Sequence, residues 1–231
     1  MSNIKRYAPI SIAYFFLNLF VFIFWWVVTD PGNYIWFITT EEKKVLLINA
    51  CSKLFLIKYY IWAVLLNAML TSFLLLSHKR ILSLLIIACT LTFFILYSFI
   101  FTPYIGRNYY IIFLNQQVSP DFQMEPVNDA GKSIGPYLLN KLQEKPSPSR
   151  KYAVKGLGEI RYEPAIDKLS SILNDDAEEI AIRAESFISL KKMKHPTSKK
   201  ILENFSRNHT DTISDSTLLR TINKIESLDI Y

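Results

Sequence analysis

One short segment of this 231-residue chain has the composition of a nucleotide-binding loop. Residues 130–136 read AGKSIGP, and a Gly-Lys-Ser triplet is typical of loops whose backbone holds phosphates. Such a loop requires another glycine five positions before Gly131, where this chain has Pro126. The segment therefore does not predict a phosphate-binding site.

Other side chains with catalytic chemistry occur without the spacing that this chemistry needs. The histidines form no HExxH motif and no paired spacing with cysteine, which argues against a zinc site; they are His78, His195 and His209. Ser133 and Ser147 lie in no nucleophile-elbow motif. Four carboxylates suit helix ends and solvent faces better than a general acid and base pair: Glu159, Glu163, Asp175 and Asp176. We expect no enzyme activity, no metal or other cofactor and no small-molecule substrate.

Two polar residues interrupt an apolar stretch long enough to cross a membrane. Lys58 and Asn67 both lie in the second such stretch. A charged or polar side chain inside a bilayer often marks an ion path or a substrate contact. Alternatively, Lys58 extends its ammonium group to the interface and Asn67 hydrogen-bonds across a pair of helices. We favour this second, structural interpretation.

Basic residues gather near the C-terminal end of the chain. They are Lys191, Lys192, Lys194, Lys199 and Lys200. Two interpretations are open: contact with anionic lipid headgroups, or an ordinary solvated helix face, which we favour. The whole chain has a net charge of +6, but the basic residues of this half are interleaved with Glu and Asp, so nucleic acid is not an expected partner.

Three apolar stretches dominate the N-terminal half, at residues 8–28, 54–76 and 81–102. About 20 apolar residues suffice for a helix to cross the hydrocarbon core, so each stretch predicts a transmembrane helix. Thr39 or Thr40, followed by two glutamates, predicts that the second helix begins before the membrane. Pro31 is expected to end the first helix and Pro103 the third.

The distribution of Lys and Arg in short loops indicates the orientation of these helices. Lys5 and Arg6 share one side with the compact basic link at Lys79 and Arg80; the other side carries Lys43, Lys44, Lys53 and Arg107. We expect an inside N-terminus, an extracytoplasmic C-terminal domain and a bacterial inner membrane. The two cysteines, Cys51 and Cys89, lie in or beside apolar segments and predict no disulfide.

The C-terminal half begins with a segment rich in Tyr and Ile. We expect residues 107–131 to form a linker or interfacial segment, whose first part could instead be a short strand. From residue 132 to 231 the apolar residues recur at spacings of three and four, which predicts helices. Their expected ranges are 133–143, 148–161, 163–174, 177–193, 197–207 and 216–228.

These helices contain an internal repeat. A shift of about 33 residues aligns five pairs of residues, in the range of helical-hairpin solenoids: Arg150 with Arg183, Ala153 with Ser186, Gly156 with Ser189, Leu157 with Leu190, and Ile160 with Met193. The small residues allow close helix approach, and the larger apolar residues supply a shared core.

The stretch from Arg150 to Met193 resembles HEAT repeats of the short, bilin-lyase-like kind. The residues that match their pattern are Arg150, Ala153, Gly156, Leu157, Gly158 and Ile160, with Asn174, Asp175 and Asp176 in the turn between units. In the second unit Lys191 stands where the pattern has glycine. The resemblance implies stacked helical hairpins that bind other proteins.

We therefore expect an all-α protein with a transmembrane region at residues 1–106 and a small soluble α-solenoid at residues 132–231. The expected function is that of a membrane-anchored scaffold or adaptor, with membrane lipid and a protein as partners. In the alternative, the helix bundle itself acts, either as an immunity protein against a membrane-targeting toxin or as a small transport component.

Overall fold

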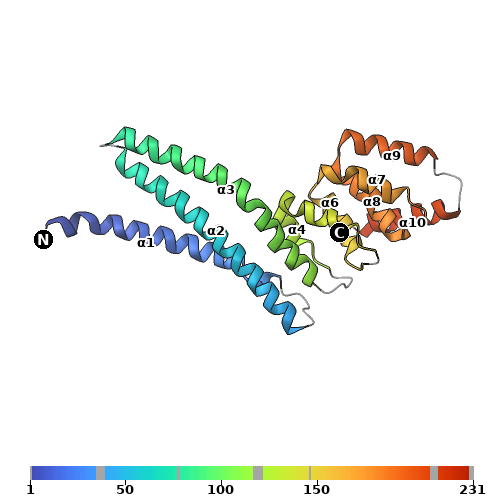
Figure 1. Ribbon diagram of the computed structural model, residues 1–231, viewed down its shortest axis with the longest axis horizontal. Helices are drawn as coiled ribbons and strands as arrows, with labels where there is room; N and C mark the ends of the chain where they lie inside the picture. The colour runs from blue at the N-terminus through green and yellow to red at the C-terminus, as the bar shows by residue number, and fades with distance from the viewer. Residues whose placement is uncertain are drawn as a thin grey trace. The chain divides into compact units, whose positions relative to one another are not determined.

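The computed structural model describes residues 2–34, 40–76, 79–116, 122–145, 147–208 and 213–228 (Figure 1). Within these ranges every regular element is a helix. The chain divides into two compact units, Met1–Asn108 and Tyr109–Tyr231. The predicted all-α class is confirmed for the described part of the chain.

Three long helices form the first unit, and the last of them continues into the second unit: α1 (Ser2–Val28), α2 (Glu41–Leu75) and α3 (Arg80–Asn115). Each contains a stretch long and apolar enough to cross a membrane. Their large apolar side chains point outward, with Phe20 66% and Ile81 78% exposed. Soluble proteins rarely expose such continuous apolar surface, and lipid would cover it. The prediction of three helices of membrane-crossing length is confirmed.

Local capping sets the start of α2 and the end of α1. Thr40 has an extended backbone, and its hydroxyl accepts a hydrogen bond from the Lys43 amide at 3.4 Å, as expected of an N-cap residue. The predicted capped start is confirmed at Thr40, whereas Thr39 lies outside the described residues. After α1, the Asp30 carboxylate accepts a hydrogen bond from the Gly32 amide at 2.8 Å and caps the short 3-10 helix η1 (Pro31–Asn33).

The prediction that Pro103 ends the third helix is wrong, because α3 continues to Asn115 with Pro103 in its interior. A proline lacks the N–H that bonds the carbonyl four residues earlier, which costs about 3 kcal/mol in a helix interior. Beyond the proline, Tyr109, Ile112 and Phe113 are fully buried in the second unit. Their packing stabilises the helical continuation, and up to Asn115 this segment forms no strand.

Short helices make up the rest of the second unit. They are α4 (Glu125–Ala130), η2 (Gly131–Ile134), α5 (Gly135–Lys141), α6 (Arg150–Glu159), η3 (Glu163–Ala165), α7 (Ile166–Leu173), α8 (Ile180–Met193), α9 (Pro196–Asn208) and α10 (Ile213–Leu228). All six predicted helices are present at nearly the predicted bounds. The segment 107–131, expected as a linker or interfacial segment, contributes the end of α3 and all of α4.

Helix α8 is the centre of the second unit. It packs against α6, α7, α9 and α10, which surround it in Figure 1. Ala184 and Leu190 are fully buried and Ile188 nearly so, as are Leu157 of α6 and Leu169 of α7. The core of this unit is therefore formed around one helix by its sequence neighbours.

The contact between α6 and α8 depends on small residues. A Cβ atom on Gly158 would lie 2.6 Å from the Cα atom of Ser189, closer than side chains are found. The Ser189 hydroxyl donates a hydrogen bond to the backbone carbonyl of Val154 at 2.9 Å. Glycine and serine thus allow the two backbones to approach and hold them together.

A residue with a positive φ angle follows each of these two helices. Arg161, after α6, and Lys194, after α8, have φ angles of 49° and 53°, a left-handed conformation that non-glycine residues rarely adopt. Lys194 is the C-cap residue of α8. The two positions are 33 residues apart, the same offset as in the sequence repeat.

Candidate functional site

Two buried arginines occupy equivalent places in consecutive helical hairpins. The Arg150 Nε atom donates to the Leu142 carbonyl at 2.9 Å, and the Arg183 Nε atom donates to the Leu173 carbonyl at 3.0 Å. Leu142 is the C-cap residue of α5, and Leu173 is the last residue of α7. Carbonyls at helix ends lack partners within the helix, so each arginine completes the end of the preceding helix.

The two arginines differ in the carboxylates that they meet. Arg150 pairs with Glu178 at 2.5 Å, and Glu178 is 5% exposed. Arg183 pairs with Asp176 at 2.9 Å, and that carboxylate is 83% exposed. Lys145 also contacts Glu178, at 2.7 Å. Glu178 therefore links the first hairpin to the turn that begins α8.

The charge state of Glu178 is set by these partners. Burial alone would raise the pKa of this carboxyl group, but hydrogen bonds from Arg150 and Lys145 outweigh it and lower the pKa to about 2. The same contact with Glu178 raises the pKa of Lys145. The three charges thus satisfy one another and join the two hairpins.

The other repeat residues form packing surface. On α6, Ala153 and Leu157 are fully buried, and both Gly156 and Gly158 are buried. Ile160 is half-buried, and Leu190 of α8 is fully buried. The sequence repeat thus identifies core positions of the second unit, not a catalytic centre.

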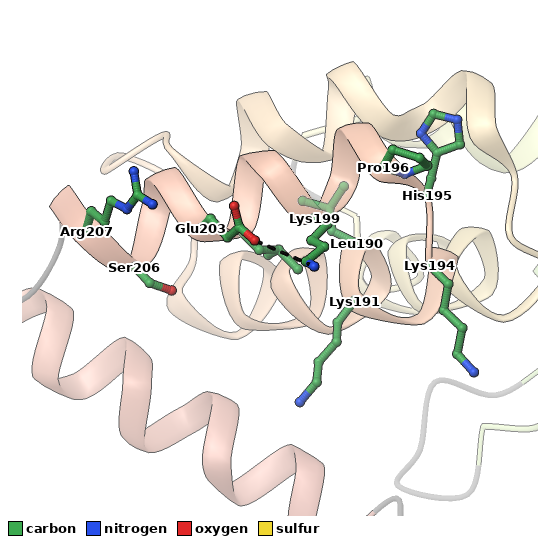
Figure 2. Close-up of a pocket in the computed structure, with 10 residues that line it drawn as sticks. Leu190, Lys191, Lys194, His195, Pro196, Lys199, Glu203, Ser206 and Arg207 are labelled. Atoms are coloured by element: carbon green, nitrogen blue, oxygen red, sulfur yellow. Dashed lines mark ion pairs between the residues drawn. The ribbon is translucent and has the colours of Figure 1, made fainter.

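An open groove of about 820 Å³ lies along the end of α8 and one face of α9 (Figure 2). Its lining combines an apolar floor with basic side chains: Leu190, Lys191, Lys194, His195, Pro196, Lys199, Leu202, Glu203, Ser206 and Arg207. We refer to it below as the basic groove. Figure 2 shows Arg207 and Lys194 at opposite ends of this set, with Glu203 and Lys199 between them.

The basic groove has an excess of positive charge that its own residues do not neutralise. Lys199 lies 3.9 Å from Glu203, a long and exposed ion pair, and Lys191 reaches Glu226 of α10 at 2.7 Å. Lys194 and Arg207 form no ion pair with any residue that the structure describes. Among the described residues, the groove therefore has a cationic group without an ion-pair partner at each end, where an anion can bind.

The structure separates the five lysines predicted as a basic cluster. Lys191, Lys194 and Lys199 line the groove. Lys192 instead pairs with Glu159 of α6 at 2.6 Å, and Lys200 is exposed on α9 outside the groove lining.

The sequence prediction of basic residues did not include two basic residues that line the groove, Arg207 and His195. A signal for Arg207 exists, because Lys199, Glu203 and Arg207 recur every four residues and so share one helix face.

A second polar cluster lies between α1 and α2 in the first unit. The side-chain amides of Asn18 and Asn67 donate to each other's carbonyl oxygens, at 3.0 and 2.9 Å. One turn away on each helix, the hydroxyls of Tyr14 and Thr71 share a hydrogen bond. The hydrogen bond across a helix pair that we expect of Asn67 is present. The four residues of this cluster are spaced by four on each helix, Tyr14 and Asn18 on α1 and Asn67 and Thr71 on α2, so each pair shares one helix face.

Lys58, the charged residue within the second apolar stretch, lies over an aromatic ring. Its Nζ atom is 5.1 Å from the centre of the Trp25 ring, within the range of cation–π attraction. The side chain is half-buried. Lys58 and the Asn18–Asn67 pair therefore each connect α2 with α1, at different levels.

Metal and cysteine chemistry find little support in the described part of the chain. No group of three or more His, Cys, Asp and Glu side chains is placed there to hold a metal ion. Cys51 is buried and Cys89 exposed, and neither forms a disulfide.

Comparisons with protein families, curated proteins and solved structures gave no match.

Proposed function

We propose that this protein is a membrane-anchored adaptor whose second unit is a short α-solenoid that binds a protein partner. The observation that carries the proposal is the repeated arginine contact: Arg150 and Arg183 each donate to the last carbonyls of the preceding helix. Two hairpins built in the same way support a repeat architecture of the HEAT kind, as the sequence resemblance implies.

The order of packing supports this architecture. Helix α8 contacts both α6 and α10, so alternate helices of this region pack side by side, as they would in stacked hairpins. Stacked hairpins expose a continuous surface, which repeat proteins use mainly for binding. Positive φ angles recur at Arg161 and Lys194, just after α6 and α8 and at the offset of the sequence repeat, which supports the repeat architecture.

In this proposal, α1, α2 and the apolar part of α3 cross a bacterial inner membrane, and the second unit lies at its extracytoplasmic surface. The basic link at Lys79 and Arg80 supports an inside position for that connection and for the N-terminus. Three crossings then place the second unit on the opposite side.

A second candidate function assigns the activity to the helix bundle. The hydrogen-bonded cluster of Tyr14, Asn18, Asn67 and Thr71 favours it, because polar groups in membrane spans are often functional. The protein would then be an immunity protein that blocks a membrane-targeting toxin, or a small transport component. The partner would contact the helices rather than the second unit.

Site-specific photo-crosslinking of the full-length protein in its native membrane separates the two candidates. A photoreactive amino acid is placed at exposed positions of the second unit, Lys168 and Glu203, and at exposed positions of the membrane helices, Phe20 and Ile81. The adaptor proposal expects a discrete protein adduct from the second unit and lipid adducts from the helices. Protein adducts from Phe20 or Ile81, with none from the second unit, would overturn it and favour the bundle.

A further inference from the structure

We infer that the basic groove between α8 and α9 binds an acidic segment of the protein partner, one that carries apolar side chains beside its carboxylates. The inference deepens the proposed function and rests on it. Sequence patterns alone do not distinguish this groove from a solvated helix face.

The lining of the groove suits such a segment. Pro196 and Leu202 offer apolar surface, and Lys191, Lys194, Lys199 and Arg207 surround it. From Lys199 to Arg207 the helix rises about 12 Å, which matches about four residues of an extended chain. Alternate side chains of an extended segment face the same way, so carboxylates and apolar groups can contact different parts of the lining.

The charge distribution favours an anionic occupant. Glu203 is the acidic member of the lining, and its ion pair with Lys199 is long and exposed. Lys194 and Arg207, at the two ends in Figure 2, have no ion pair with a described residue. Two carboxylates of one segment can therefore reach a free cation at each end.

The shape of the site favours a protein segment over a lipid surface. A flat layer of headgroups is met by lysines that project from a convex face, whereas these cations border a hollow with an apolar floor. Lys199 and the neighbouring Lys200 are both exposed, but only Lys199 lines the groove. A lipid surface would attract both lysines equally, whereas a segment in the groove would contact Lys199 alone.

The same helices provide matched control positions. Lys194 and Arg207 line the groove, whereas Lys168 of α7 and Lys200 of α9 are exposed outside it. The double variant Lys194→Glu with Arg207→Glu changes the net charge as much as Lys168→Glu with Lys200→Glu does. A difference between the two variants therefore reports on the groove and not on total charge.

The test uses the full chain in nanodiscs of zwitterionic lipid and a fluorescent peptide of about ten residues in which Glu alternates with Leu. A peptide with Gln in place of Glu is the neutral control. We expect fluorescence anisotropy to show binding of the acidic peptide that weakens with added salt. The groove variant should weaken binding about tenfold, and the control variant by less than about twofold.

Three results would overturn the inference: no binding of the acidic peptide, equal binding of the Gln peptide, or equal weakening by both double variants. In a parallel arm, zwitterionic and anionic vesicles replace the peptide. Groove-dependent capture of anionic vesicles without peptide binding would assign the groove to lipid and also overturn the inference. Photo-adducts between the second unit and a protein, together with any of these results, would leave the adaptor proposal standing while this inference fails.

Discussion

Arg150 and Arg183 lie 33 residues apart and donate the same hydrogen bond, from Nε to the terminal carbonyl of the preceding helix. Their surroundings differ at one point, because Arg150 meets the buried Glu178 and Arg183 meets the exposed Asp176. The repeat thus contains a natural comparison between a buried and an exposed ion pair.

Removal of the two arginine charges should therefore have unequal effects. Arg150→Met leaves a buried carboxylate with Lys145 as its remaining cation, and we expect a loss of about 3 kcal/mol in the free energy of unfolding. Arg183→Met leaves an exposed carboxylate that water solvates, and the loss should be about 1 to 2 kcal/mol. Urea unfolding of the second unit in the micelle-bound protein, followed by circular dichroism, measures both values. Equal losses would show that burial of Glu178 does not matter.

The stability of the second unit should depend on pH through Glu178. Its pKa in the folded protein is about 2, below its ordinary value of 4.5. The carboxyl group then contributes stability above pH 4.5, and this contribution is lost as the pH falls from 4.5 towards 2. The difference between these two pKa values corresponds to about 3 kcal/mol in the free energy of unfolding.

The variant Glu178→Gln isolates this effect, because glutamine keeps the shape and does not titrate. Urea unfolding is measured at pH 7, 4 and 3 for both proteins. We expect the native protein to be more stable at pH 7 and the difference to shrink at pH 3. A difference that stays constant over this range would rule out Glu178 as its source.

Gly158 should tolerate no side chain at all. Alanine at this position places Cβ against the Ser189 backbone, which cannot rotate away, and we expect a loss of about 1 to 3 kcal/mol. Gly156→Ala is the matched control on the same helix, since its Cβ would meet the end of the Leu138 side chain at 3.0 Å. Thermal unfolding should show a clear loss for Gly158→Ala and a smaller one for Gly156→Ala. The opposite order would contradict the close approach of α6 and α8.

The amides of Asn18 and Asn67 should stabilise the contact of α1 and α2 jointly. Either residue changed to Leu leaves the other amide without its partner in an apolar layer, at a cost of about 1 to 2 kcal/mol. The double variant should cost less than the sum of the two single variants. A double-mutant cycle on unfolding in mixed micelles measures the coupling, and strict additivity would mean that the two amides act independently.

Local sequence rules predicted most of the helices because composition and periodicity act over short ranges. The apolar stretches exceed the length that a membrane needs, and Thr40 with Glu41 forms a recognisable start signal. The same rules failed at Pro103, where a local helix breaker is outweighed by the burial of Ile112 and Phe113 in distant packing. Such tertiary stabilisation is not encoded in the neighbouring residues.

The sequence predicted a cluster of lysines in this region, but not which of them line the basic groove. Lys192 looked equivalent to Lys191, yet Glu159, 33 residues earlier, pairs with it. Lys191 stands at the repeat position of Gly158, 33 residues later. The structure explains the exchange: Gly158 lies against the Ser189 backbone, whereas Lys191 extends to Glu226 and lines the groove.

The membrane anchor is tested most directly by cysteine labelling in intact cells. In a background with Cys51→Ala and Cys89→Ala, single cysteines replace Asn33 between α1 and α2, Lys79 between α2 and α3, and Ser147 in the second unit. Three crossings with an inside N-terminus predict that a membrane-impermeant maleimide labels positions 33 and 147 and that position 79 is protected until the membrane is opened. Labelling of 79 and 147 from the same side would contradict the three-helix anchor.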